Sequence, residues 1–378
     1  MRNYLALVGA SKTDDPHRFL LATFNIDYIL GFANAGGIKR ALSNLSIPEA
    51  TTTERENERR MDSVYNRIVA SIGAQTQETK KYAFRALSWI GYATRTLTIQ
   101  ELLVAISVEA NQYQLDDSDA FRCEDLLDIC KGLVIADGQH VRLVHISARN
   151  YLDRHQVIPE DAGESYRAIA CSTYLSFDQF KELHSSYSFN GPERSFPFLD
   201  YAADNFTFHL SKVERRQYPE TTSAVMKLLG DQGHRRAYCA VNKTIQMQLD
   251  IPRLNLACVI GYEDAVRTIL EEGDVDVNAK DSTIGLTPLS WAVLMGHEPV
   301  IRRLLGDGRI DRDWKDSTGS TALWLAIRSK NTEILGLFLE NGIELNFTFA
   351  TMVRKSNYGI KKCYKRLKLP SFVTIECR

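Results

Sequence analysis

The run of residues that most nearly resembles a chemical site lies at the start of the chain, where Gly9 is followed by Ala, Ser, Lys and Thr13. A phosphate-binding loop follows the pattern G-x-x-x-x-G-K-[ST], in which backbone N–H groups between the glycines cradle the phosphates. This run has the lysine and the threonine but lacks the spacing glycines and a surrounding strand–helix–strand unit. The sequence therefore predicts no nucleotide site and no other cofactor.

Histidine, cysteine and serine residues could otherwise supply hydrolytic or metal chemistry. Neither H-E-x-x-H nor G-x-S-x-G occurs, and the eight histidines are scattered along the chain. Cys130, His140 and His145 could converge around a predicted hairpin, but their spacing is not that of metal ligands. We therefore expect no catalytic residue and no metal site.

The segment around these residues is predicted to be mostly helical. Apolar residues recur at helical spacing over 61–68 and 83–90. Thr98 and Glu101 have the spacing of a capping box, in which each side chain bonds the backbone N–H of the other residue. These patterns predict three successive helices.

A small β-hairpin is predicted directly afterwards. Asp137-Gly138 separates two short apolar runs, 133–136 and 141–146, and Asp-Gly between such runs is typical of a two-residue hairpin loop. Ser147 is the predicted N-cap of a final helix. Helices followed by a hairpin and another helix predict a winged-helix domain over residues 61–155.

The amino-acid sequence of this stretch resembles that of a known family. The segments LSWIGYATRTLTIQELLVAISVE, DLLDICKGLVI and VRLVHISARNYL occur in order between residues 87 and 152. They resemble the winged helix that follows the NACHT NTPase domain in fungal-type NACHT–ankyrin proteins, a segment named for its similarity to part of a GPI inositol-deacylase. The resemblance implies an NLR-like protein of the STAND class, in which an NTP-driven switch carries ankyrin repeats that sense a partner.

The resemblance also gives His145 two interpretations. In related STAND NTPases, a winged-helix histidine near this position contacts the phosphates of the bound nucleotide. The alternative is a structural histidine hydrogen-bonded within its own domain. We favour the structural interpretation, because the chain has no phosphate-binding loop to supply that ligand.

DNA binding, a common role of winged helices, is disfavoured by charge. The segment before the hairpin, 116–131, carries six carboxylates against Arg122 and Lys131. Phosphate contacts supply most non-specific affinity for DNA, so an acidic helix would repel the duplex. We expect this domain to dock proteins.

Two helical segments flank the winged helix. Residues 14–50 resemble the helical end of a NACHT domain, and the charged residues 51–60 are predicted to form a connector. Residues 163–245 are a predicted helical linker, in which FPFLDYAADNF resembles the helix that joins winged helix to ankyrins in the same family. We predict that this linker is a spacer without chemistry.

A repeat begins near residue 250. Ala257, Ala292 and Ala326 occupy equivalent positions at intervals of 35 and 34 residues, and Thr287-Pro288 matches the T-P-L start of an ankyrin inner helix. The pattern predicts about three ankyrin repeats over 250–348.

The concave side of these repeats is the predicted partner-binding surface. It is formed by the ends of the inner helices and by the tips of the fingers, the loops that lead from one repeat to the next. Its predicted residues are Val259, Ile260, Ser282, Thr283, Leu286, Leu294, Met295, Ser317, Thr318, Ser320, Arg328 and Ser329. Several of them are apolar, which predicts a groove for a helix or an extended segment. Trp291 and Trp324 are interpreted as core residues.

The last repeat is predicted to lack a polar outer face. Leu335, Leu337, Phe338 and Leu339 crowd into one short helix, and no further repeat follows. We expect either the tail or a second copy of the chain, by self-association, to cover that helix. The tail, 352–378, has eight Lys/Arg residues against one Glu and is otherwise predicted to be disordered and solvated, with contact to acidic lipid or RNA less favoured.

Composition sets the general class of the protein. With 44% apolar residues, 25% charged residues and a net charge of −1, the chain is typical of a soluble globular protein without a field that recruits nucleic acid. Seven cysteines without C-x-x-C spacing indicate reduced thiols in a cytoplasmic protein. No run approaches the ~20 apolar residues of a membrane span.

We therefore predict a mostly α-helical, non-enzymatic adaptor or sensor, with a winged helix, a helical linker and an ankyrin-repeat solenoid. It would correspond to a truncated NACHT–ankyrin protein that binds a protein partner in the ankyrin groove, without nucleotide or DNA. Two alternatives stay open. The tail does not follow the repeat period, which suggests a nonfunctional product of a disrupted gene. The resemblance to a deacylase segment suggests, less strongly, a domain associated with a hydrolase or an NTPase.

Overall fold

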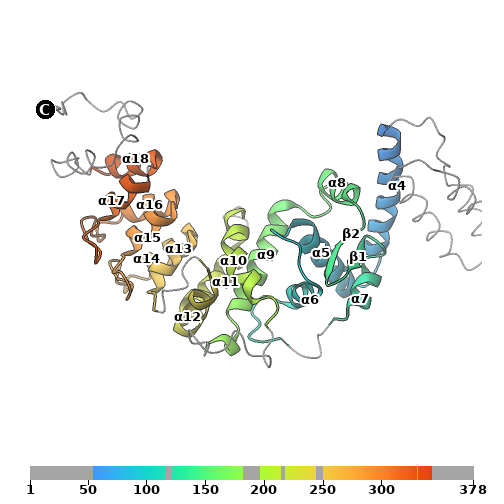
Figure 1. Ribbon diagram of the computed structural model, residues 1–378, viewed down its shortest axis with the longest axis horizontal. Coiled ribbons are helices and arrows are strands. Elements are labelled where there is room, and N and C mark those ends of the chain that lie inside the picture. The colour runs from blue at the N-terminus through green and yellow to red at the C-terminus, as the bar shows by residue number, and fades with distance from the viewer. Residues whose placement is uncertain are drawn as a thin grey trace, which may run out of the picture. The chain divides into compact units, whose positions relative to one another are not determined.

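The structure is a computed structural model that describes residues 54–115, 121–181, 196–213, 218–243, 250–329 and 331–342. The chain is mostly helical and forms two compact units (Figure 1). The first unit comprises the described residues of 54–107 and 121–160, and the second those of 108–115 and 161–342. The predicted NACHT-like segment 14–50 and the tail 352–378 lie outside the described residues.

Three helices open the first unit, namely α4 (Glu54–Gly73), α5 (Gln77–Tyr92) and α6 (Ile99–Ser107). The predicted capping box is present at α6. The Glu101 N–H donates to Thr98 Oγ1 at 3.2 Å, and the Thr98 N–H donates to Glu101 Oε2 at 2.8 Å. Leu97 and Leu102 are buried beside it, so this helix start is fixed by both polar and apolar contacts.

The predicted connector over 51–60 is wrong from Glu54 onward, because α4 already begins there. The many charged residues of this segment suggested a solvated connector. However, Glu and Arg have high intrinsic helix propensity, and they extend the helix that Met61 and Val64 anchor in the core.

The wing of the first unit follows α7 (Cys123–Ile129). Strands β1 (Val134–Asp137) and β2 (His140–Leu143) pair antiparallel, with Val134 opposite Leu143 and Asp137 opposite His140. Gly138 in the loop has a φ of +62°, which a residue without a Cβ adopts readily. Helix α8 (Ile146–Arg154) ends the unit, so the predicted winged-helix fold is confirmed.

Beyond residues 108–115, the second unit contains a linker of four α-helices, namely α9 (Glu160–Leu175), α10 (Leu199–Ser211), α11 (Pro219–Gly230) and α12 (Gln232–Val241), with the short 3-10 helix η2 (Asp178–Phe180) between α9 and α10. Within this linker the sequence pattern predicted helices at 165–175, 197–210 and 222–229 but not α12, because the first turn of α12 contains Gly233 and a polar run that hides its apolar face. Tyr238 and Cys239 form that buried face, which packs on the rest of the linker.

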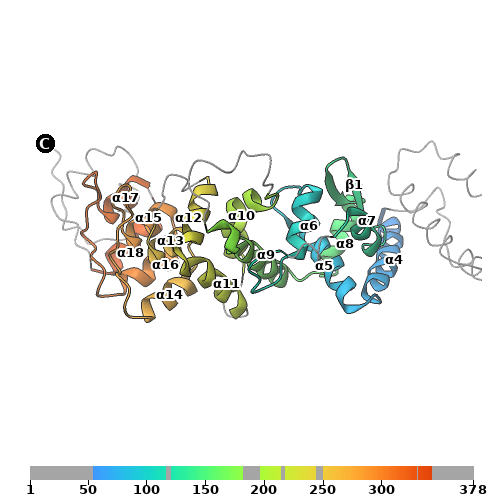
Figure 2. The same ribbon diagram turned by 90° about the horizontal axis from the view of Figure 1, so that it is seen from below.

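Three helix pairs complete the second unit (Figure 2): α13 (Arg253–Ile260) with α14 (Glu263–Glu271), α15 (Pro288–Met295) with α16 (Glu298–Leu305), and α17 (Ala322–Ser329) with α18 (Thr332–Glu340). Inner helices α13, α15 and α17 pack in succession, as do the outer helices. Thr287 caps α15 by accepting the Ser290 N–H at 3.3 Å, and Pro288 takes the first turn as predicted.

The outer helix of the last repeat, whose apolar residues were predicted to need a cover, is buried over more of its surface than the other two outer helices. In α14 and α16 one face is buried, whereas α18 buries five consecutive residues, Ile334 to Phe338. Leu337 is only 3% exposed, although the equivalent positions carry Thr268 and Arg303. That the tail or a second copy covers this helix stays a prediction, because residues 343–378 are not described.

Candidate interaction surfaces

Most of the predicted partner-binding residues are accessible. The finger residues Ser282, Thr283, Ser317 and Thr318 are exposed, and Ser320 is half-buried. At the other end of the inner helices, Leu294 is 46% exposed, Arg328 and Ser329 are exposed and Met295 is half-buried. These nine residues stay candidates for contact with a partner.

Val259, Ile260 and Leu286 are not accessible, with exposures of 7%, 3% and 2%. Helix α11 packs against α13 and α14, so the linker takes the place of a preceding repeat and the first repeat is interior. Leu286 lies at the base of its finger, where its carbonyl accepts from Asn255 Nδ2 at 2.9 Å. The prediction that these three residues line an open groove is wrong.

Two carboxylates, the buried Asp281 and the half-buried Asp316, fix the shape of the fingers. Asp281 accepts the backbone N–H groups of Thr283, Ile284 and Leu286 at 2.7–2.9 Å. In the next finger, Asp316 accepts the N–H groups of Thr318 and Ser320. Burial alone would raise the pKa of Asp316, but these hydrogen bonds outweigh it and hold the pKa below its usual value. Both carboxylates therefore act as rigid supports for the tips.

Aromatic residues near the fingers have separate roles. Trp291 is buried and donates its Nε1–H to Asp281 Oδ2 at 3.2 Å, which confirms its interpretation as core. Trp324 is half-buried. Trp314 was missed by the sequence analysis: it donates to the Gly285 carbonyl at 3.3 Å, and the Lys280 ammonium lies 3.8 Å from its ring centre. This cation–π pair adds an aromatic and cationic feature to the finger side.

The linker contains a polar network that the sequence analysis did not predict. His209 on α10 contacts Glu164 on α9 through Nδ1 and Oε2 at 2.7 Å, and Tyr201 lies 2.9 Å from His209 Nε2. Arg167 pairs with Glu164 at 3.0 Å. Glu164, Arg167 and His209 are 2%, 0% and 0% exposed, so this network is sealed from solvent. The core of the linker therefore contains buried charged side chains as well as apolar ones.

Burial and charge fix the protonation of this network. Burial lowers the pKa of His209, so its ring is neutral; Nδ1–H donates to Glu164 and Nε2 accepts the Tyr201 hydroxyl. Burial alone would raise the pKa of Glu164, but hydrogen bonds from His209 and Arg167 hold it below its usual value. An ionised Glu164 therefore balances the charge of the buried Arg167.

The stability of the second unit is expected to fall as pH drops from 7.5 to 5.5. Burial lowers the pKa of His209, His234 and His297 below the ordinary 6.5. Below about pH 6.5 the unfolded chain therefore binds more protons than the folded chain. The stability contributed by each neutral ring is complete above that pH, and below it each histidine lowers the free energy of unfolding by up to about 1.4 kcal/mol per pH unit. Thermal unfolding followed by circular dichroism at several pH values checks this. A midpoint that rises on acidification would contradict the sign, and His234→Gln should flatten the dependence.

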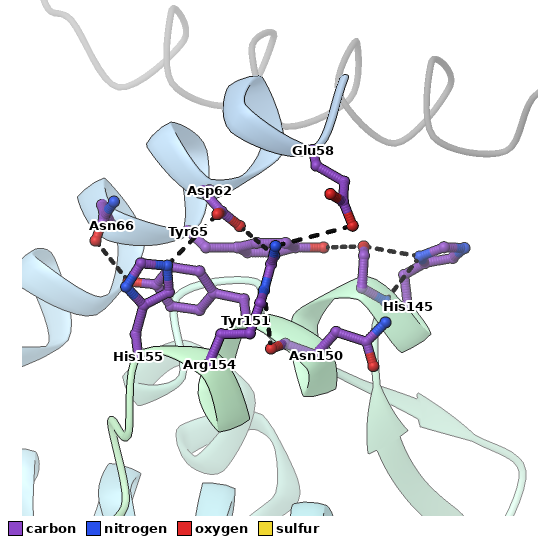
Figure 3. A network of polar contacts seen from close by, with 10 residues as sticks. Glu58, Asp62, Tyr65, Asn66, His145, Asn150, Tyr151, Arg154 and His155 are labelled. Atoms are coloured by element: carbon purple, nitrogen blue, oxygen red, sulfur yellow. Dashed lines mark hydrogen bonds and ion pairs between the residues drawn. The ribbon is translucent and has the colours of Figure 1, made fainter. Parts of the chain in front are cut away.

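In the first unit, a polar network joins α4 to α8 (Figure 3). Arg154 bonds Asp62 at 2.7 Å and lies 3.8 Å from Glu58. The Tyr151 hydroxyl donates to Asn66 Oδ1 at 2.7 Å. Surface ion pairs contribute about 0–1 kcal/mol, so the network orients α4 more than it stabilises the fold.

His145 lies at the end of this network, where Figure 3 shows it beside α8. It caps α8 by accepting the Ser147 N–H at Nδ1, at 3.2 Å. The Ser147 hydroxyl contacts His145 Nδ1 at 2.9 Å and the Tyr65 hydroxyl at 2.7 Å. The predicted Ser147 cap is wrong, because His145 has the extended backbone of an N-cap and α8 begins at Ile146, one residue before Ser147. These contacts favour the structural interpretation of His145.

Cysteine thiols and clusters of metal-ligating side chains are the remaining candidates for chemistry. The five cysteines in the described ranges are unpaired thiols, and burial raises the pKa of Cys130 and Cys239 to about 12. Within those ranges, no group of three or more His, Cys, Asp or Glu side chains is placed to hold a metal. None of the described helices is both long and apolar enough to traverse a bilayer.

Two parts of the chain match known protein families. Residues 71–162 match the family described as GPI inositol-deacylase, winged helix domain, and residues 254–348 match Ankyrin repeats (3 copies). A search of curated proteins gave no match. The chain thus has a winged helix of the inositol-deacylase type followed by ankyrin repeats, which confirms the fold part of the resemblance. Neither match extends to a NACHT domain.

Proposed function

We propose that this chain is a non-enzymatic adaptor that holds a segment of a partner protein against the finger side of its ankyrin repeats. The observation that carries this proposal is the row of exposed hydroxyl side chains on two preorganised fingers, Ser282, Thr283, Ser317 and Thr318. Ankyrin repeats support protein–protein interaction as the general role.

The chemistry of the finger side suits a peptide backbone. The Ser282 and Thr318 hydroxyls already donate to the Asp250 carbonyl at 3.3 Å and to Asp316 Oδ1 at 2.6 Å, so they can accept N–H groups of an extended segment. The Thr283 and Ser317 hydroxyls can also donate to its C=O groups. The Ser317 N–H donates to the Ile284 carbonyl at 3.0 Å, which locks neighbouring fingers together and lowers the entropy lost on binding. Exposed Leu294 offers an apolar contact at the far end of α15.

The proposal extends to a cytoplasmic signalling protein of the NLR-like class, on the strength of the sequence resemblance. The winged helix would then dock protein rather than DNA. In support, α7 carries Glu124, Asp125 and Asp128, and the neighbouring Arg122 is engaged by Asp125 at 2.9 Å. An acidic helix of this kind opposes contact with phosphates.

Site-specific photocrosslinking in cells tests the proposal. With a benzoylphenylalanine at Thr283 or Ser317, we expect a covalent adduct with one defined partner, because these side chains would lie within the interface. The matched control is the same probe at Arg302, which is exposed on an outer helix. With the identified partner, Leu294→Asp should weaken binding at least about tenfold, or 1.4 kcal/mol. Equal adducts from both faces, or none from the fingers, would contradict the proposal.

A further inference from the structure

A cleft of about 480 Å³ lies between the linker helix α10 and the first two repeats. Phe208 and Ser211 of α10 form one wall. His297, from the turn between α15 and α16, and Pro299, in the first turn of α16, form the opposite wall. The cleft is thus built jointly by a linker helix and the repeats, at the end of the repeats remote from the fingers.

The floor of the cleft is apolar and held in place. Leu210, Ile260 and Tyr262 line it and are each less than 4% exposed. The Tyr262 hydroxyl lies 2.9 Å from Thr222 Oγ1 on α11, which anchors the ring to the linker. This floor therefore exists before any ligand arrives.

Phe208 gives the cleft an accessible aromatic wall. Its side chain is 43% exposed, an unusual state for a large apolar residue in this structure. The Lys212 ammonium lies 5.0 Å from its ring centre, one helical turn along α10. Exposed Pro299 on the opposite wall offers a second flat apolar surface. Two such walls suit a planar ring.

His297 places a hydrogen-bond acceptor in this apolar setting. Its Nε2 lies 2.9 Å from the Val259 carbonyl, which can only accept, so Nε2 carries the proton. Burial lowers the pKa of His297 and keeps the ring neutral, which leaves Nδ1 as a bare acceptor. Across the described residues, Nδ1 has no hydrogen-bond partner, and the side chain is partly exposed.

We propose that this cleft receives a tryptophan side chain from a partner protein, with the indole between Phe208 and Pro299 and its N–H donated to His297 Nδ1. Tryptophan fits because its polar edge donates and does not accept, whereas phenylalanine has no donor. Tryptophan is also enriched among residues that dominate binding energy in interfaces. The proposal makes α10 part of the recognition surface, which goes beyond the finger side.

Random peptides displayed on phage and selected on the full chain test this assignment. The expected result is a set of binders that share a tryptophan. Replacing that tryptophan by 1-methyltryptophan, which lacks only the N–H donor, should weaken binding at least about tenfold. Ser211→Trp, which fills the cleft, and Phe208→Ser should weaken binding similarly. Asp200→Trp, exposed on the first turn of the same helix, is the control and should leave the affinity unchanged.

Several outcomes would overturn the assignment. Binders without tryptophan, or equal affinity for the 1-methyltryptophan peptide, would show that His297 accepts no indole N–H. Binding retained by Ser211→Trp but lost in Thr283→Trp would place the peptides on the fingers. Thermal unfolding of each variant separates a filled cleft from a misfolded chain. Because the crosslinking positions lie on the fingers, failure at the cleft leaves the proposed function untouched.

Discussion

Glu164→Gln is expected to lower the free energy of unfolding of the second unit by about 3–5 kcal/mol, because it removes one partner from a buried ion pair. Arg167 is fully buried and pairs with Glu164 at 3.0 Å. The amide of glutamine fills the same space as the carboxylate but carries no charge. The variant would therefore leave a buried guanidinium uncompensated, with His209 still neutral beside it.

Urea unfolding monitored by tryptophan fluorescence measures the effect, since three of the four tryptophans, Trp291, Trp314 and Trp324, lie in the second unit. Hydrogen exchange in α9 and α10 localises it. The matched control is Glu220→Gln on α11, which is exposed and should change stability by no more than about 1 kcal/mol. An equal effect of the two substitutions would show that the buried pair contributes no more than a surface carboxylate.

Gly261→Ala is the second substitution with a large expected effect, a loss of about 2–4 kcal/mol, because two costs add. Gly261 has a φ of +80°, in the left-handed region that disfavours a side chain. A Cβ at this position would also lie 2.5 Å from the His297 ring. Either the ring or the end of α13 must move, so the contact between the first two repeats is disturbed.

Gly296→Ala separates these two costs. Gly296 ends α15 with a φ of +81°, but a Cβ there meets nothing within 4 Å. We expect it to lose only the backbone contribution, about 1–2 kcal/mol. Thermal or urea unfolding of both variants gives the comparison. If Gly296→Ala is as destabilising as Gly261→Ala, the His297 contact contributes nothing and the left-handed backbone explains both.

The sequence by itself determined the elements that depend on near neighbours. Thr98 and Glu101 form their capping box because both partners lie within one helical turn. Asp137-Gly138 starts a tight loop for the same local reason. The ankyrin period is visible in the sequence because each repeat has the same helix–turn–helix pattern of residues. Such signals require no knowledge of what packs against the element.

Tertiary structure decided which surfaces are open. Val259 and Leu294 occupy equivalent positions in successive repeats, yet Val259 is buried and Leu294 is not. The difference arises because the linker packs against the first repeat, a contact between elements that the repeat pattern does not encode. The exposure of Phe208 likewise depends on where α10 lies relative to the repeats.

Tertiary structure also brought together the polar groups of the linker network and of the network between α4 and α8. Glu164 and His209 are 45 residues apart in sequence, and Tyr65 and Ser147 are 82 apart. No spacing rule relates such pairs, because the intervening chain can take many paths before packing selects one. Local propensity therefore fixed most of the helices and the wing. Which carboxylate contacts which histidine was decided only when apolar faces packed against one another. The same packing decided which clefts stay open for a partner.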